Sequence, residues 1–310
     1  MGLDPRARRF LDLVAASARG RAGAPDLSDL RQAAAGLAAF AGPAPEVERR
    51  DELLAGAAPA LALRHYCPPG RSDAELPALV YFHGGGWTSG SLDTHDALCA
   101  TLAGRAECRV IAVDYRLAPE HRFPQGIEDG VAAVSAIAAD PRRFGADPRR
   151  LGIAGDSAGA NLAVVVARAS RAPLALQVLL CPVMEPLGRT RSRQTLASGY
   201  LIEEATMARY WEHYRVEGLA PDDPRVAPVR ADSLAGLPPA LIHVAEFDPL
   251  RDEGELYAAA LSHAGIRVEL TTHAGLIHHF YGLGGVIPAA QAALERIGHE
   301  IRRAFAGIAG

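Results

Sequence analysis

Between residues 151 and 159 the chain reads Leu151-Gly152-Ile153-Ala154-Gly155-Asp156-Ser157-Ala158-Gly159, and this stretch decides the fold. Its apolar start predicts a buried strand, and a helical pattern follows from residue 158 to about 171. The Gly-x-Ser-x-Gly motif between them permits a tight turn that lifts the serine oxygen above a sheet edge. The motif therefore predicts a nucleophile at Ser157, with a glycine-rich packing turn as the alternative.

The same alternation of strands and helices continues through the rest of the chain. Predicted strands are Leu61–Tyr66, Ala78–Phe82, Val110–Asp114, Leu151–Ala154, Leu176–Leu180, Ala240–Ala245 and Val268–Thr272. Predicted helices cover residues 95–106, 126–139, 158–171, 252–264 and 286–305. Residues 1–45 predict two further helices, with a break at Pro25 and an N-cap at Ser28. Apolar strands alternating with helices indicate an α/β protein with a mostly parallel sheet covered on both faces.

One connection is far longer than the others. About sixty residues separate the strand ending at Leu180 from the one beginning at Ala240, whereas such connections usually need only about two to six. Within it, residues 203–216 have helical periodicity. An insertion at the C-terminal end of a sheet strand is well placed to form a lid.

Composition excludes several classes of protein. All 32 basic residues are arginine, so every mechanism that needs a lysine amine is excluded, including a Walker A loop and a pyridoxal-phosphate Schiff base. A net charge of −4 argues against nucleic acid as a partner. No apolar run approaches the roughly 18 residues that a membrane-spanning helix needs. The N-terminal segment reads as an amphipathic helix rather than a signal peptide, which predicts a cytoplasmic protein.

The four cysteines are too few and too irregularly spaced for a disulfide framework. We interpret Cys67, Cys99, Cys108 and Cys181 as small buried side chains of a protein from a reducing compartment. None of them lies in a Cys-x-x-Cys pair, so a catalytic cysteine is not predicted.

A glycine triplet follows the predicted strand Ala78–Phe82, in the segment His83-Gly84-Gly85-Gly86-Trp87. Glycine lets backbone N–H groups approach a substrate oxygen on which negative charge develops. We therefore predict an oxyanion hole from the N–H groups of Gly84, Gly85 and Ala158. We expect His83 to brace this loop rather than to transfer protons.

A serine nucleophile also needs a base and a carboxylate that orients the base. Asp248 lies just beyond the strand Ala240–Ala245, and the segment after Val268–Thr272 contains His273, His278 and His279. Active sites of open α/β sheets gather at such strand ends. The spacing of the three histidines fits no metal-binding motif, so no metal is predicted. Which of the three is the base stays open on the residues alone.

These segments together resemble the bacterial hormone-sensitive-lipase-like (family IV) esterases of the α/β-hydrolase superfamily. The matching segments are His83–Trp87, Asp114–Glu120, Gly155–Gly159, Asp222–Val229, Leu237–Glu253 and Gly275–Phe280. The resemblance implies a triad of Ser157 as nucleophile, His278 as base and Asp248 as orienter, without a cofactor. The sequence departs from the family at His279, where the family usually has glycine, and at His273-Ala274.

The resemblance also implies a domain organisation. A helical cap would be built from residues 1–45 and 185–230, over a catalytic core of residues 46–184 and 231–310, and a homodimer is compatible with it. Residues 53–60 lack the family's glycine-rich hairpin turn, so the first edge strands are expected to differ. We interpret Asp252 and Glu253 as the N-cap and a first-turn acid of the next helix, not as catalytic groups.

The predicted function is a serine carboxylesterase that hydrolyses short- to medium-chain acyl or small aryl esters. An amidase, lactonase or deacetylase acting on one metabolite is the alternative. A non-catalytic receptor, similar to the plant gibberellin receptors, is disfavoured because the histidine those receptors lack is present here. Candidate pocket residues, which are equally interpretable as core, are Trp87, Tyr200, Leu201, Trp211, Tyr214 and Phe280.

Overall fold

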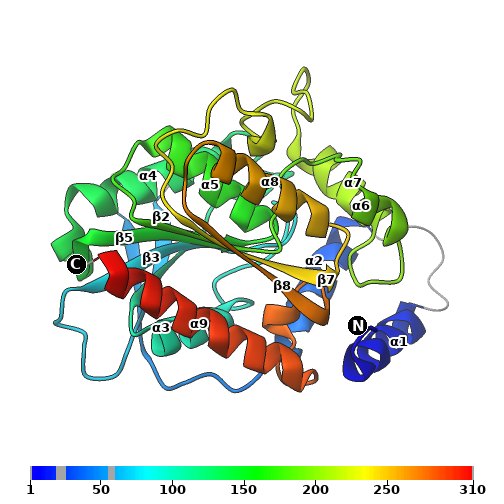
Figure 1. Cartoon of the computed structure of the whole chain (residues 1–310), viewed down its shortest axis with the longest axis horizontal. Helices are drawn as coiled ribbons and strands as arrows, with labels where there is room; N and C mark the ends of the chain where they lie inside the picture. Colours follow the sequence, from blue (N-terminus) through cyan, green and yellow to red (C-terminus); the bar gives the residue numbers. More distant parts are fainter. Residues whose placement is uncertain (1, 19–25, 55–59, 309–310) are drawn as a thin grey trace.

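The computed structural model describes residues 2–18, 26–54 and 60–308. A single eight-stranded sheet runs through it in the order β1-β2-β4-β3-β5-β6-β7-β8 (Figure 1). The strands are β1 (Glu48–Leu54), β2 (Leu61–Cys67), β3 (Leu76–Phe82), β4 (Arg109–Val113), β5 (Ala146–Asp156), β6 (Leu176–Leu180), β7 (Ala240–Phe247) and β8 (Val268–Ile277). The β1–β2 and β2–β4 pairs are antiparallel, and every other pair is parallel.

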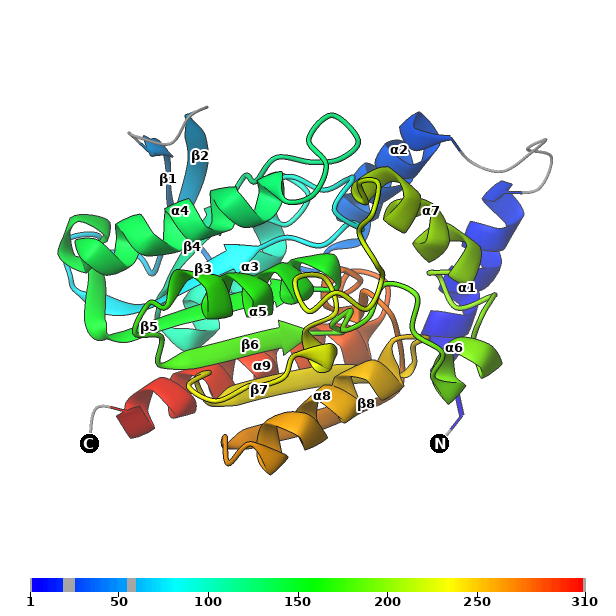
Figure 2. The same ribbon diagram turned by 90° about the horizontal axis from the view of Figure 1, so that it is seen from above.

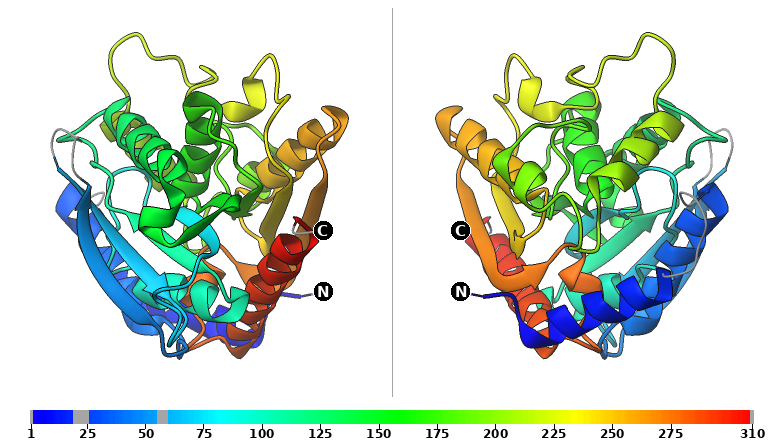
Figure 3. Two further views of the ribbon diagram at one scale, coloured as in Figure 1. Left: turned by 90° about the vertical axis from the view of Figure 1, so that its left-hand side faces the viewer. Right: turned by 90° about the vertical axis from the view of Figure 1, so that its right-hand side faces the viewer.

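Helices cover both faces of this sheet (Figures 1 and 3). On one side lie α4 (Gln125–Ala139), α5 (Ala158–Ser170) and α8 (Arg251–His263), and on the other α3 (Asp96–Ala106) and α9 (Pro288–Ile308). Successive side chains of a strand point to opposite faces. In β3, Val80 and Phe82 accordingly lie in the core under α4 and α5, while Leu79 and Tyr81 lie in the core under α3 and α9. The α/β fold and the covered parallel sheet predicted from the sequence are confirmed.

Element boundaries differ from the predicted ones mainly at ends that the apolar pattern does not mark. Strands β5 and β8 are longer than predicted, and β1 is a charged edge strand that the hydrophobic pattern missed. The N-cap of α2 (Leu27–Leu37) is Asp26, so the prediction of Ser28 is wrong. Asp26 and Asp29 each accept the other's backbone N–H. The predicted break at Pro25 and the connection at 55–59 lie outside the described residues.

Four helices gather beyond the carboxyl ends of the central strands (Figure 2). They are α1 (Pro5–Ala18) and α2 from the N-terminal segment, and α6 (Arg191–Thr195) and α7 (Glu204–Tyr214) from the long connection. Arg31 on α2 bonds Glu120 through both Nη atoms, at 2.8 and 2.6 Å, and donates from Nε to the Thr88 carbonyl at 2.9 Å. Helix α2 is thus tied to loops at the same edge of the sheet as Ser157.

A buried ion pair ties the long connection to the core. Arg193 on α6 donates to Glu253 on α8 at 2.5 Å, and both side chains are 2% exposed. Glu253 also accepts the N–H groups of Met184 and Glu185, at 2.7 and 2.9 Å. Both residues therefore have the partners that buried charges require. The predicted role of Asp252 as N-cap is wrong, because Leu250 holds that position and Asp252 accepts the N–H of Ser192.

Removing one partner of this pair should destabilise the fold strongly. We expect Glu253→Ala to lower the free energy of unfolding by about 3–5 kcal/mol, because it breaks a buried ion pair and leaves the Arg193 Nε and two backbone N–H groups without their acceptor. Urea unfolding followed by circular dichroism measures the change. Glu212→Ala, which removes a surface partner of Arg215, is the control and should stay within about 0.5 kcal/mol. Equal losses in the two variants would contradict the role assigned to Glu253.

Among the described residues, no helix has the length and apolar character needed to cross a membrane.

Candidate active site

Ser157 lies on a strained turn between β5 and α5. Its backbone has φ 52° and ψ −119°, a conformation that non-glycine residues rarely adopt. Its N–H donates to the Leu180 carbonyl of β6 at 2.8 Å. The flanking glycines are sterically required, since a Cβ at Gly159 would lie 2.1 Å from the Phe82 carbonyl oxygen and one at Gly155 would lie 2.4 Å from that of Gly159. The turn therefore has the geometry that the motif predicts, with Ser157 5% exposed.

Asp248 and His278 meet at the same edge of the sheet. Asp248 directly follows β7, and His278 directly follows β8. His278 Nδ1 lies 2.8 Å from Asp248 Oδ2, and the other carboxylate oxygen accepts the N–H of Leu250 at 2.8 Å. Because an ionised carboxylate only accepts, Nδ1 carries the hydrogen. In the neutral ring, the lone pair that can take a proton is then on Nε2.

The other two histidines of this segment face elsewhere. The His279 backbone has φ 61°, and its Nε2 lies against Gly282, where a Cβ would be 2.3 Å away. Desolvation is the main cause that lowers the pKa of His279 to about 3. His273 Nε2 lies 3.2 Å from His243 Nδ1 on β7. Across the described part of the chain, only His278 of the three is hydrogen-bonded to Asp248.

Cys181 is a neighbour of Asp248 that the sequence analysis missed as part of the site. It follows β6 directly, with its backbone at φ 44°, and donates its N–H to the His243 carbonyl at 2.7 Å. Its Sγ lies within 4.8 Å of the ligand atoms of Asp248 and His278. Burial, and then the charge of Asp248, raise the pKa of the Cys181 thiol well above its ordinary value. All four cysteines are free and buried, as expected.

The glycine loop differs from the prediction in one donor. The Gly84 N–H donates to Asp156 Oδ1 at 2.9 Å, so the prediction that it serves the oxyanion hole is wrong. Within the described residues, the N–H groups of Gly85, Gly86 and Ala158 have no acceptor. His83 is placed to brace the loop, since its Nδ1 lies 2.8 Å from the Gly84 carbonyl oxygen and its own carbonyl accepts the Tyr115 hydroxyl.

Most of the candidate pocket residues are packed side chains. Trp87 and Tyr214 stack with ring centroids 4.7 Å apart, and Trp211 lies at 6.4 Å from Tyr214. Phe280 is buried against His273, with ring centroids 4.5 Å apart. Tyr200 and Leu201 are half-buried, and Tyr200 stacks on Phe247. Their lining of a substrate pocket stays a prediction.

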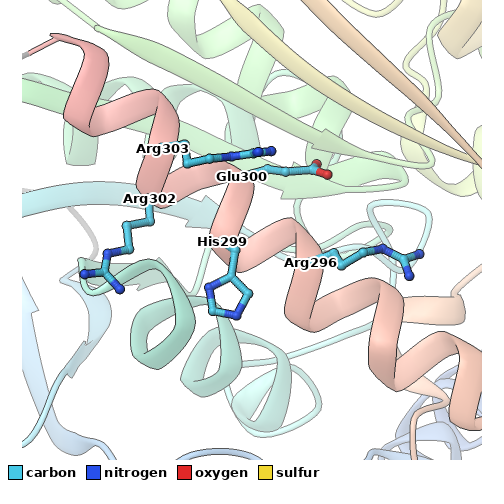
Figure 4. A pocket seen from close by; sticks show the side chains of 5 residues that line it. All are labelled: Arg296, His299, Glu300, Arg302 and Arg303. Atoms are coloured by element: carbon cyan, nitrogen blue, oxygen red, sulfur yellow. The ribbon is translucent and has the colours of Figure 1, made fainter.

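A surface hollow lies away from these residues, on α9. Its volume is about 610 Å³, and it is lined by Arg296, His299, Glu300, Arg302 and Arg303. Figure 4 shows these side chains spreading from both sides of one stretch of the helix. All except Glu300 are exposed, and none belongs to the segments that hold Ser157, Asp248 and His278. We assign no role in catalysis to it.

Buried neutral histidines should make the fold sensitive to acid. Burial is the main cause that lowers the pKa of His65, His83 and His273 to about 4 and that of His243 to about 3. Below the unfolded pKa of about 6.5, the unfolded chain binds more protons than the folded one. Stability is therefore complete above pH 6.5 and falls as the pH drops toward 4, by about 1.4 kcal/mol per pH unit for each histidine.

Thermal unfolding between pH 7 and pH 4.5 measures this loss. The variant His65→Gln should show a shallower fall of the melting temperature over the same range, because one histidine no longer titrates. A melting temperature independent of pH below 6.5 would contradict the prediction.

Comparison with known proteins agrees with the fold. The family model described as "alpha/beta hydrolase fold" matches residues 79–282. Two relatives from Mycobacterium tuberculosis are the carboxylic ester hydrolase LipN and the carboxylesterase NlhH. LipN is 42% identical over 84% of this chain and 74% of its own length. NlhH is 40% identical over 79% of both chains.

Solved structures match over nearly the whole chain. The ester hydrolase EH1AB1 from the metagenome of Lake Arreo superposes with a TM-score of 0.93 at 38% identity, covering 98% of this chain and 99% of its own. The hyperthermophilic esterase of Pyrobaculum calidifontis has a TM-score of 0.87 at 36% identity, covering 98% and 99%. The resemblance inferred from the sequence motifs is confirmed. The chain belongs to the hormone-sensitive-lipase-like branch of the α/β-hydrolase family and is a carboxylic ester hydrolase.

Proposed function

We propose that this hydrolase is a serine carboxylesterase, with Ser157 as nucleophile, His278 as general base and Asp248 as the residue that orients His278. The observation that carries the proposal is the 2.8 Å contact between His278 Nδ1 and Asp248 Oδ2, at the sheet edge that also holds the strained turn of Ser157. A base oriented by a buried carboxylate, together with a serine at the same sheet edge, is the constellation that acyl transfer requires.

The reaction has two half-reactions. His278 Nε2 takes the Ser157 hydroxyl proton as the oxygen attacks the ester carbonyl, and the imidazolium then protonates the departing alcohol. This leaves an acyl group on Ser157. Water attacks the acyl-enzyme with His278 again as base, the Ser157 oxygen takes back a proton, and the carboxylic acid leaves.

Backbone N–H groups stabilise the tetrahedral intermediates. We assign the oxyanion hole to Gly85, Gly86 and Ala158, because their N–H groups have no acceptor among the described residues while Gly84 is bonded to Asp156. Ala158 is also the first residue of α5, so the positive end of the helix dipole adds to its N–H.

The substrates we propose are short- to medium-chain acyl esters or small aryl esters. Ser157 is only 5% exposed, which favours compact acyl groups over long chains. Two relatives have names in keeping with this choice. An ethyl acetate hydrolase from Pseudomonas putida is 39% identical over 76% of this chain, and an arylesterase from Saccharolobus solfataricus is 32% identical over 91%. We assign the covering role to residues 1–45 and 185–230, which carry α1, α2, α6 and α7.

Hydrolysis of p-nitrophenyl esters from acetate to palmitate tests the substrate class. We expect kcat/KM to be highest for acetate to hexanoate and to be lost at palmitate. A fluorophosphonate should label the protein once, at Ser157, as read from peptide masses. Labelling without turnover of any ester would redirect the substrate assignment to an amide or a lactone. The absence of both would contradict the proposed function.

A further inference from the structure

A buried carboxylate lies directly beside the nucleophile and takes no part in the mechanism above. Asp156 is the last residue of β5 and is 1% exposed. Its Oδ1 accepts the Tyr81 hydroxyl at 2.5 Å and the Gly84 N–H at 2.9 Å. His95 Nε2, just before α3, lies 3.3 Å from Oδ1 and 3.4 Å from Oδ2. Asp156 therefore joins β3, the glycine loop and the start of α3.

Both ring nitrogens of His95 have polar neighbours. Thr94 Oγ1 accepts the Ser91 N–H at 2.9 Å and donates to the Ser91 carbonyl at 3.0 Å. The same hydroxyl oxygen lies 2.9 Å from His95 Nδ1. The Nε2 atom faces the Asp156 carboxylate. Contacts at both ring nitrogens therefore fix the His95 ring against Asp156.

The surroundings keep Asp156 ionised. Burial opposes the charge of Asp156, but the charge and hydrogen bond of His95 outweigh it and hold the pKa of Asp156 below its ordinary value. The neighbouring His83 ring, 5.4 Å from that of His95, is neutral because burial lowers its pKa to about 4. The Asp156 carboxylate is held firmly in place, since moving it would leave a buried charge without its hydrogen-bond partners.

The glycine loop needs such an anchor. Gly85, Gly86 and Trp87 have φ values of 116°, 61° and 60°, so three successive residues lie in the left-handed region. On one side the Gly85 carbonyl is held by the N–H groups of Thr88 and Ser89 and by the Ser89 hydroxyl. On the other side the contact is Asp156 with the Gly84 N–H. A Cβ at Gly84 would lie 2.2 Å from Asp156 Oδ2, so only glycine fits against the carboxylate.

We propose that Asp156, held by His95, is a positioning residue that fixes the glycine loop relative to Ser157. Asp156 directly precedes Ser157 in the chain, and its carboxylate accepts the Gly84 N–H of the glycine loop. It therefore sets the distance between Ser157 and the N–H donors of Gly85 and Gly86. This inference rests on the proposed function. It assigns Asp156 no proton transfer and no contact with substrate.

Asp156→Ala and Asp156→Asn test this role with p-nitrophenyl acetate and its thionoacetate analogue. Sulfur is a weak hydrogen-bond acceptor, so thionoester hydrolysis depends less on the oxyanion donors. We expect Asp156→Ala to lower kcat for the ester by about 10²-fold, the order of magnitude of one lost oxyanion donor. KM should stay nearly constant, and the thionoester rate should fall much less. Asp156→Asn retains an acceptor for Gly84 and should restore kcat to within about tenfold.

Asp147→Ala is the matched control, because Asp147 is a buried aspartate near the other end of β5. It should change stability without changing the ester-to-thionoester ratio. An equal fall in both rates of Asp156→Ala, or a raised KM at constant kcat, would overturn the proposal.

If Asp156→Ala does not fold, Asp156→Asn decides alone. A smaller loss confined to the ester supports the proposal, and equal losses on ester and thionoester overturn it. Absence of ester turnover in the unmodified protein would instead be a failure of the proposed function.

Discussion

Replacing Ser157 with alanine lowers kcat for p-nitrophenyl acetate by about 10⁴-fold or more, because no acyl-enzyme can then form. The strained turn itself should survive, since its conformation is required by the packing of Gly155 and Gly159 against backbone oxygens. The loss should therefore appear in kcat, while the melting temperature stays equal or rises. Steady-state rates with the variant, together with its fluorophosphonate labelling, measure the effect.

Ser262→Ala is the control for this substitution. Ser262 lies at the exposed end of α8, away from the strand ends that carry the site, and its loss should leave kcat unchanged. If Ser157→Ala kept more than a tenth of the activity, the serine mechanism would be wrong.

The second large effect concerns Asp248. We expect Asp248→Asn to lower kcat by about 10⁴-fold with little change in stability. An amide presents either an N–H or a weaker neutral acceptor to His278 Nδ1. The neutral ring can then adopt the other tautomer, with its lone pair on Nδ1 facing residue 248 and its hydrogen on Nε2 facing Ser157. His278 would then be unable to accept the serine proton. The imidazolium formed during catalysis would also lose its buried counter-charge.

Asp252→Asn provides the matched comparison, because Asp252 is an acid of the same segment that bonds Ser192 instead of a histidine. We expect its kcat to stay within about twofold of the unmodified protein, as is usual for a substitution outside the site. A pH–rate profile completes the measurement. Equal activity in Asp248→Asn and Asp252→Asn would remove Asp248 from the mechanism.

Much of the fold could be predicted from the sequence, because apolar runs indicate buried strands and glycine motifs indicate tight turns. The strand Leu176–Leu180 was predicted to the residue, since both of its faces are buried and four of its five residues are apolar. The edge strand β1 was missed because charged side chains dominate it and leave no apolar run. The cap of α2 was misplaced by two residues, since Asp26 and Ser28 are both suitable N-cap residues.

The site shows a similar division. Sequence order and strand ends placed Ser157, Asp248 and the histidine segment at one edge of the sheet. They could not assign hydrogen bonds: whether the Gly84 N–H points to a substrate or to Asp156 depends on loop torsions that three equivalent glycines do not reveal. The place of Cys181 beside Asp248 was missed for the same reason, because the two residues meet through the packing of β6 beside β7.

The positive φ of Ser157 has a consequence beyond chemistry. A non-glycine residue in this conformation costs about 1–3 kcal/mol, which the two cores of the sheet must offset. That cost is comparable to a sizeable part of the net stability of an ordinary domain, about 5–15 kcal/mol. Thermostability and turnover therefore make opposite demands at this one position. Selection for heat resistance alone would favour a residue that adopts this φ without strain, and only selection for activity retains the serine.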